Sequence, residues 1–240
     1  MILANESKRS IMKISIQLII SMFLISMCYS CGGRPYRFKN VLKTDIDLVA
    51  DFHFEEVNNY LKTLMIKLYK RNPSELKKNS NETIDSRMKI IFQYENDLRF
   101  EELGNKQGIE AMLLTFEETY RGDRVFSLVA GLARMILKSY NDQREFYIID
   151  TLDQQKLYNS ARNIEILVWR LSNKKKSSGQ LFLLTNESTG EVTNLSFERL
   201  FGKMISTQDM MARIVADKTN RTITFIVHRL ATAAFLPVGF

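Results

Sequence analysis

The clearest pattern in the chain is a stripe of apolar side chains that recurs every three or four residues between Thr44 and Pro73. This spacing places the apolar side chains on one face of an α-helix. Thr44 can cap the start of the helix, acidic residues follow in its first turn, and Asn72-Pro73 stops it. The sequence therefore predicts a long amphipathic helix, whose inner face comprises Ala50, Phe54, Val57, Leu61, Leu64 and Leu68.

Weaker helical patterns continue along the rest of the chain. We expect a shorter helix over 84–92 and a helical hairpin over 109–136 that turns at Gly122, with Asp123 capping its second member. This second member is apolar around much of its circumference, so it should be the most buried helix. Further helical patterns cover residues 150–173, 197–205, 207–217 and 221–234.

These patterns predict a mainly α fold, a single domain of six to eight helices that spans residues 44–240. A short apolar run followed by turn residues allows one small β-hairpin near residues 180–193. The last ten residues, 231–240, carry no charge and include Phe235 and Val238. An exposed apolar terminus is unusual, so this tail should dock, either on the domain's own core or in a partner protein or a lipid pocket.

The N-terminal region has a different organisation. A stretch with three basic residues precedes an uncharged, mostly apolar run from Ile14 to Met27. Secretory signal segments have this order, and the run is shorter than the roughly 20 residues that a transmembrane helix needs. Residues 1–30 are therefore predicted to be a signal peptide, whose start is either Met1 or Met12.

The stretch from Leu24 to Gly33 resembles a bacterial lipobox, in which small residues precede the cysteine that receives lipid and becomes the mature N-terminus. Two cysteines compete for this role. Cys31 follows the small Ser30, whereas Cys28 follows the bulky Met27. Cys31 is thus the favoured lipidation site and Cys28 the alternative.

This resemblance covers about residues 12–33 and implies a lipoprotein of a bacterial cell envelope, anchored to a membrane through its N-terminal lipid. In such lipoproteins, a residue other than Asp after the cysteine usually permits export to the outer membrane. Gly32 therefore implies the outer membrane, facing the periplasm. In the competing interpretation, Cys28 and Cys31 form a CxxC redox pair or simply lie in an apolar N-terminal helix. CxxC redox sites, however, belong to a strand-to-helix context that the sequence does not predict here.

The charge is positive overall, and the residues that follow the predicted anchor are basic. The chain has 34 basic and 27 acidic residues, and it stays positive without residues 1–30. The lipidated linker, residues 31–43, contains the membrane-proximal residues Arg34, Arg37, Lys39 and Lys43. These charges fit either attraction to anionic lipid head groups or a solvated linker that they keep extended. Nucleic acid is a poor partner for an exported protein, even at a pI near 9.3.

Catalytic and metal-binding motifs are scarce. The only histidines are His53 and His228, and neither belongs to a motif with metal-ligand spacing. No nucleophile elbow or glycine-rich phosphate loop is present. The sequence therefore predicts no cofactor and no metal site, and it favours a non-enzymatic role.

Two groups of residues could still carry function. Carboxylate doublets at 55–56, 101–102 and 117–118 offer acids for glycan hydrolysis, but adjacent residues on a helix point in different directions and are typical of solvated faces. The triplet Arg121-Gly122-Asp123 matches an adhesive sequence, yet a turn and a helix cap explain it.

Three functional hypotheses follow. The first is a membrane-anchored envelope lipoprotein with a non-enzymatic role, either structural or in binding a partner protein of the envelope. The second is a carrier of an apolar ligand, which needs a hydrophobic cavity lined by residues such as Met112, Phe116, Met135 and Trp169. The third is a cell-wall hydrolase, which needs a cleft with opposed acids.

Overall fold

The computed structural model describes residue 17 and residues 44–79, 81–93, 97–147, 152–186, 194–225, 230 and 232–239. Residues 43–240 form one compact unit. The described residues confirm the predicted mainly α fold and contain no strand. Their helices are α2 (Asp45–Arg71), α3 (Pro73–Leu76), α4 (Ile84–Phe92), the 3-10 helix η2 (Glu101–Leu103), α5 (Gly108–Leu114), α6 (Arg124–Ser139), α7 (Gln154–Asn173) and α8 (Ser196–Thr219).

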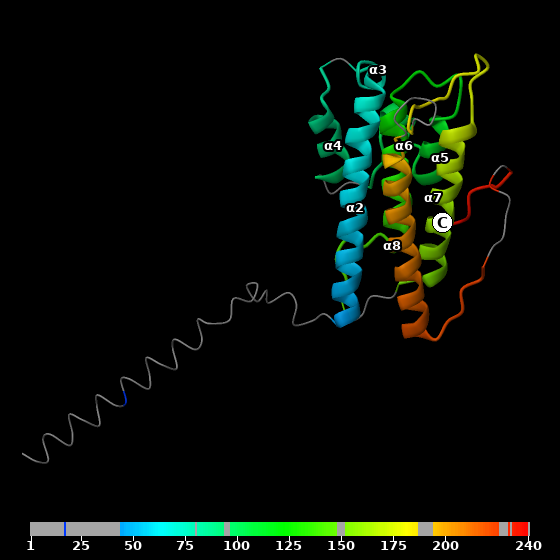
Figure 1. The fold of residues 1–240 in the computed structure, drawn as a ribbon. Coiled ribbons are helices and arrows are strands. Elements are labelled where there is room, and N and C mark those ends of the chain that lie inside the picture. The colour runs from blue at the N-terminus through cyan, green and yellow to red at the C-terminus, as the bar shows by residue number, and fades with distance from the viewer. Residues whose placement is uncertain are drawn as a thin grey trace, which may run out of the picture. The chain divides into compact units, whose positions relative to one another are not determined.

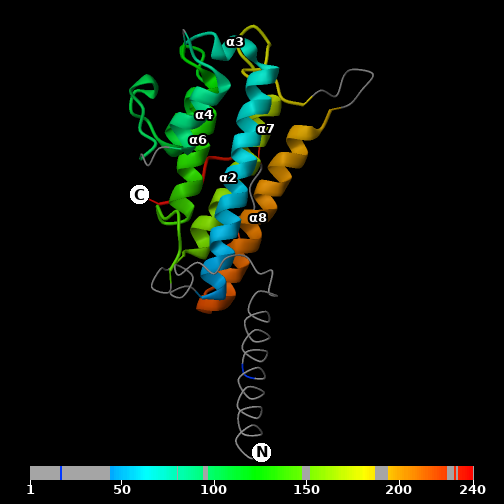
Figure 2. The same cartoon turned by 90° about the vertical axis from the view of Figure 1, so that its left-hand side faces the viewer.

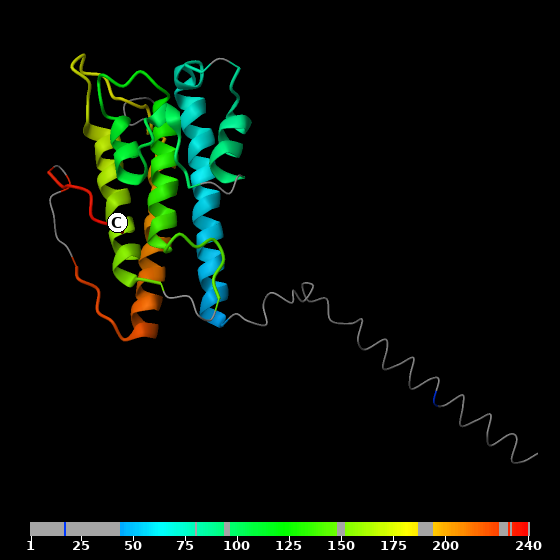
Figure 3. The same cartoon turned by 180° about the vertical axis from the view of Figure 1, so that it is seen from behind.

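Four long helices form the body of this unit. α2 and α7 each pack against both α6 and α8, so the four helices close a ring around one core. Successive long helices run in opposite directions, as Figures 1 and 3 show from the front and the back. The arrangement is an up-down-up-down four-helix bundle. The shorter helices α3, α4 and α5 belong to the connection between α2 and α6. Helices α3 and α4 lie near the upper end of α2 (Figure 2), whereas α5 packs against α6.

Helix α2 follows its predicted pattern closely. The Asp47 N–H donates to the Thr44 side chain, and the Thr44 N–H donates to the Asp47 carboxylate over 2.7 Å, which forms a capping box. Asn72 ends the helix, and Pro73 opens α3. All six predicted inner-face residues are buried, so the first helix and its apolar face are confirmed.

Helix α6 is buried at nearly every position, as predicted. Asp123 caps it by accepting a 3.0 Å hydrogen bond from the Phe126 N–H. A side chain at Gly131 would place its Cβ 2.5 Å from the Gly108 carbonyl oxygen and 2.6 Å from the Met112 nitrogen. Only glycine therefore allows α5 to lie so close to α6, and this contact fastens the predicted hairpin.

The C-terminal region differs from the prediction in two ways. The two helices expected over 197–205 and 207–217 are one continuous helix, α8. The helix expected over 221–234 is absent from its described residues, 221–225, 230 and 232–234, which are not helical. Asn220, at φ 51°, ends α8 in the left-handed conformation that commonly terminates helices.

The two helices were expected as separate apolar runs on either side of Ser206. The structure explains the continuity, because Gln208 is fully buried and its side chain is hydrogen-bonded inside the bundle. A polar residue with buried partners does not interrupt a helix, so the prediction of two helices was wrong.

The described part of the segment after α7 contains isolated bridge residues in place of strands. An antiparallel bridge joins Lys175 to Leu181 around a turn at Gly179. The bridge lies earlier than the hairpin allowed near 180–193, and residues 187–193 lie outside the described residues. Among the described helices, none is both long and apolar enough to cross a membrane.

Candidate functional site

The predicted lipidation site lies outside the described residues. This holds for Cys31, for the alternative Cys28, and for the membrane-proximal basic residues Arg34, Arg37, Lys39 and Lys43. Lipidation at Cys31 therefore stays a prediction. Thr44, where the described domain begins, marks the end of the bundle that we call the base.

His53 lies on α2 and faces α8, where it hydrogen-bonds to the backbone of Thr207. Burial lowers its pKa below the ordinary value, and its buried Nδ1 atom has no hydrogen-bond partner among the described residues. His228 lies outside the described residues. Within the described part of the chain, no group of three or more potential metal ligands comes together.

The carboxylate doublets do not face one another across a cleft. Glu55 and Glu56 are exposed on α2. Glu102 forms an ion pair with Arg87, while Glu118 accepts hydrogen bonds from Ser177, which lower the pKa of its carboxyl. Each acid is thus engaged locally or solvated, but only the doublet 55–56 lies on an α-helix, because 101–102 belong to η2 and 117–118 follow the end of α5.

The triplet 121–123 is part of the helix connection. Asp123 is buried as the cap of α6. Gly122 packs against the ring of Tyr120, where a Cβ would come within 2.4 Å of the hydroxyl oxygen. The turn-and-cap interpretation of this triplet is therefore confirmed.

A buried charged cluster, which the sequence analysis missed, joins α4 to α2 and α6. The Arg87 guanidinium, only 3% exposed, donates two hydrogen bonds of 2.8 and 2.7 Å to Glu102. It also lies 3.6 Å from the Asp123 carboxylate, which accepts a 2.6 Å hydrogen bond from the Tyr69 hydroxyl. The ring of Phe126 stacks against the guanidinium at 3.5 Å. We call these five residues the Arg87 cluster.

The sequence did contain one indication of this cluster. Arg87 lies three residues after Ile84 and four before Ile91, so it shares the apolar face of α4. An arginine at such a position must either reach water or find a buried acid. The surrounding aromatic ring and the pairing of both terminal nitrogens of the guanidinium indicate that the cluster is structural, although the Arg87 Nε atom finds no hydrogen-bond partner among the described residues.

A second buried cluster is uncharged and joins α6, α7 and α8. The Tyr140 hydroxyl donates to the Gln208 Oε1 atom over 2.9 Å. The Gln208 Nε2 atom donates to the Ser139 hydroxyl over 3.0 Å and to the Ser160 hydroxyl over 2.7 Å. We call these four residues the Gln208 cluster. Burial raises the pKa of Tyr140, so its phenol stays protonated and can donate.

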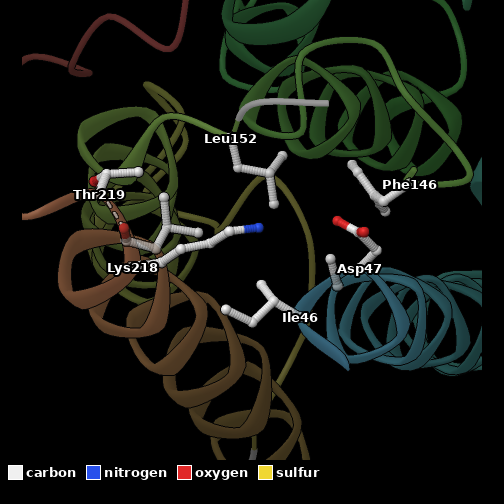
Figure 4. Close-up of a pocket in the computed structure, with 8 residues that line it drawn as sticks. Ile46, Asp47, Phe146, Leu152, Lys218 and Thr219 are labelled. Atoms are coloured by element: carbon white, nitrogen blue, oxygen red, sulfur yellow. Dashed lines mark hydrogen bonds between the residues drawn. The ribbon is translucent and has the colours of Figure 1, made fainter. Parts of the chain in front are cut away.

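A small cavity of about 60 Å³ opens at the base. The lining is mostly apolar, and the Lys218 side chain extends into it from α8 while Asp47 lies on the α2 side (Figure 4). This volume is well below the ~150 Å³ of an engineered cavity that binds benzene, so it can hold a few water molecules but is too small for a lipid chain. The lining residues are Ile46, Asp47, Ala50, Phe146, Leu152, Val215, Lys218 and Thr219.

The cavity that an apolar-ligand carrier would need was expected elsewhere, around Met112, Phe116, Met135 and Trp169. The first three of these residues are buried in the main core. Met112 packs so closely on α6 that its Cγ atom lies 2.7 Å from the Cβ position of Gly131. None of the four lines the cavity at the base.

The opposite end of the bundle is strongly basic. We call this end the apex, and it consists of residues 67–79, 115–124 and 174–186 with the first turn of α8. Asn72 joins two of these segments, because its side chain accepts from the Leu184 N–H over 2.8 Å and donates to the Leu184 carbonyl over 2.9 Å. Its exposed basic residues are Lys70, Arg71, Lys77, Lys78, Arg121, Lys174, Lys175 and Arg199.

The exposed acids of the described apex are fewer, and apolar side chains lie among the cations. Glu117, Glu118 and Glu198 are exposed there. Leu184 and Leu195 are 49% and 48% exposed. The apex therefore combines exposed positive charges with accessible apolar area, which suits contact with an acidic partner.

The tail was expected to dock, and its described residues, 232–239, lie along α7 (Figures 1 and 3). Val238 is buried there at 5% exposure.

Searches of family models, curated proteins and solved structures with this chain found no match.

Proposed function

We propose that this chain is a lipid-anchored lipoprotein of a bacterial cell envelope, held through Cys31, whose non-enzymatic role is to bind a partner protein. The order of basic stretch, apolar run and cysteine in residues 1–31 supports the anchor. Gly32 supports the outer membrane, with the domain facing the periplasm. The described bundle supplies the surface that meets the partner.

The observation that carries the binding role is the separation of charge along α2. Its first half, 45–58, has five acidic residues and no lysine or arginine, whereas its second half, 59–71, has four basic residues and no acid. A helix of this length spans about 40 Å. The basic apex is thus presented at the end of the bundle away from Thr44, where the predicted linker joins the domain.

Complementary charge steers proteins together and sets their orientation. The apex fits a protein with an acidic surface, and Leu184 and Leu195 offer apolar area that such a partner can cover. The close packing around Met112 and the small volume at the base favour this role over that of an apolar-ligand carrier.

One experiment in native membranes tests both parts of the proposal. A photo-crosslinking residue replaces Lys175 at the apex or, as the matched control, the exposed Glu55 on the acidic half of α2. We expect a protein adduct from position 175 that is much weaker from position 55. The adduct should fall at least fivefold when Lys70 and Lys174 are both changed to Glu.

Mass spectrometry of the same material reports on the anchor. We expect a diacylglyceryl mass on Cys31 that disappears in Cys31→Ala and persists in Cys28→Ala. An unmodified N-terminus would refute the anchor. Equal adducts at positions 175 and 55, or an adduct insensitive to charge reversal, would refute the binding surface.

A further inference from the structure

The C-terminal part of the chain is held on α7 by side chains that bond to its backbone. Asn163 donates to the Leu236 carbonyl over 2.9 Å and accepts from the Leu236 N–H over 2.7 Å. Asn159 donates to the Pro237 carbonyl over 2.8 Å. One turn earlier, Gln155 makes the same paired contact with Thr224, at 3.2 and 2.9 Å.

These side chains form one continuous row. Gln155, Asn159 and Asn163 are spaced four residues apart and so share one face of α7. Arg170 extends the row by donating to the Ala233 carbonyl over 3.3 Å, and its guanidinium lies 4.6 Å from the centre of the Phe235 ring. We call these four residues the α7 strip.

The chemistry of the α7 strip selects an extended backbone more than a particular sequence. A carboxamide that both donates to and accepts from one residue reproduces the pairing that two residues exchange in an antiparallel sheet. Asn163 is 0% exposed and Asn159 is 5% exposed beneath the tail. Buried amides need such partners, so the strip is organised to hold a polypeptide.

The tail itself buries few of its side chains on α7. Of its described residues, 232–239, only Val238 is buried, while Phe235 and Leu236 are partly exposed. Each ordered residue of the tail loses conformational entropy, and the tail buries few apolar side chains that could offset this loss. The docked tail is thus held weakly enough for a competing segment to replace it.

We propose that the α7 strip is a binding site for an extended apolar segment of a partner protein, and that the chain's own tail occupies it as a competing ligand. The segment needs a free N–H at the position of Leu236 and an aromatic side chain at the position of Phe235. Backbone recognition with pockets for alternate side chains is an established mode of peptide binding. This inference rests on the protein-binding role proposed above, and it does not depend on the lipid anchor.

The test uses a fluorescent peptide with the sequence of residues 232–239 and the full chain. In the variant Phe235→Ala with Val238→Ala, the tail loses its apolar contacts while the α7 strip is intact. We expect fluorescence anisotropy to show at least tenfold tighter peptide binding to this variant than to the wild-type chain. Methylation of the peptide nitrogen at the Leu236 position removes the N–H that Asn163 accepts, and it should weaken binding at least tenfold.

A strip variant and a matched control complete the design. Asn163→Ala, added to the loosened-tail variant, should abolish peptide binding. Asn173→Ala should leave it unchanged, because Asn173 is exposed on the same helix and its side chain donates to the Trp169 carbonyl of its own turn. The methylated peptide needs no strip variant, so the proposal stays testable even if Asn163→Ala unfolds.

Three results would overturn the inference. These are no peptide binding to the loosened-tail variant at millimolar concentration, equal binding of the methylated peptide, or a wild-type dimer that the loosened tail dissociates. The last result would assign the strip to the tail of a second copy. A missing lipid on Cys31 would leave this test unaffected, and failed peptide binding would leave the anchor unaffected.

Discussion

Each of the two buried polar clusters joins several helices, one through uncharged groups and the other through charged groups. The Gln208 cluster joins three helices of the bundle through neutral groups. The Arg87 cluster joins α4 to α2 and α6 through a guanidinium and two carboxylates. The neutral cluster lies where long helices already bury large apolar faces. The charged cluster holds a nine-residue helix whose buried residues are Arg87 and Ile91.

This difference indicates what each cluster contributes. Long helices gain stability mainly from apolar contact, so Gln208 chiefly fixes the register among α6, α7 and α8. A short helix that buries little apolar area depends on the polar contacts that hold it to the rest of the domain. We therefore expect the fold to tolerate loss of the neutral cluster better than loss of the charged one.

The largest effect is expected from Arg87→Met. Without the guanidinium, Asp123 is left buried without its cation, and burial already raises the pKa of this carboxyl. The free energy of unfolding should fall by about 3–5 kcal/mol. Urea unfolding followed by circular dichroism measures the change. Changing the exposed Arg99 to Met is the control and should alter stability by less than about 0.5 kcal/mol.

If Arg87→Met lowered the free energy of unfolding by less than about 1 kcal/mol, this would contradict the proposal that Arg87 holds α4 in place. Arg87→Lys sharpens the test, because lysine keeps the charge but cannot donate two parallel hydrogen bonds to Glu102. This variant should lie between Arg87→Met and the wild-type chain.

Gln208→Leu should have a smaller effect, about 1–3 kcal/mol. The Tyr140 hydroxyl loses its acceptor, but no buried charge loses its partner. The Ser139 and Ser160 hydroxyls keep their hydrogen bonds to backbone carbonyls of their own helices. The same urea experiment applies. Ser206→Ala, on the exposed side of α8, is the matched control. A Gln208→Leu effect as large as that of Arg87→Met would refute the comparison.

The same comparison shows what the sequence could and could not predict. Local information determined α2, because its cap, apolar stripe and terminating Asn72-Pro73 are adjacent in sequence. The continuity of α8 was missed because Gln208 finds its partners on α6 and α7. Arg87 was missed for a related reason, since Glu102 and Asp123 belong to other segments.

The candidate surfaces also differ in how far apart their residues lie along the sequence. The basic linker was predicted from four neighbouring positions and lies outside the described residues, whereas the apex gathers charges from distant segments of the chain. Only packing brings these segments together. The α7 strip was likewise hidden, because Gln155, Asn159 and Asn163 are typical of a solvated helix face until the tail covers them.

The smallest expected effect is a pH dependence of stability that comes from His53, which lies next to the Gln208 cluster and can titrate. His53 contacts the backbone of Thr207, next to Gln208, and burial lowers its pKa from 6.5 in the folded chain. The unfolded chain then binds the proton more readily. The free energy of unfolding should therefore be highest above pH 6.5 and fall as the pH decreases from there towards the folded-state pKa.

His53→Gln should flatten this decline in urea unfolding curves recorded between pH 7.5 and about pH 5. Gln208→Leu should lower the free energy of unfolding equally at every pH in that range, because none of its partners titrates there. Parallel pH profiles for wild type and His53→Gln would show that α2 and α8 separate without protonating this histidine. Burial between the two helices would then not control its charge.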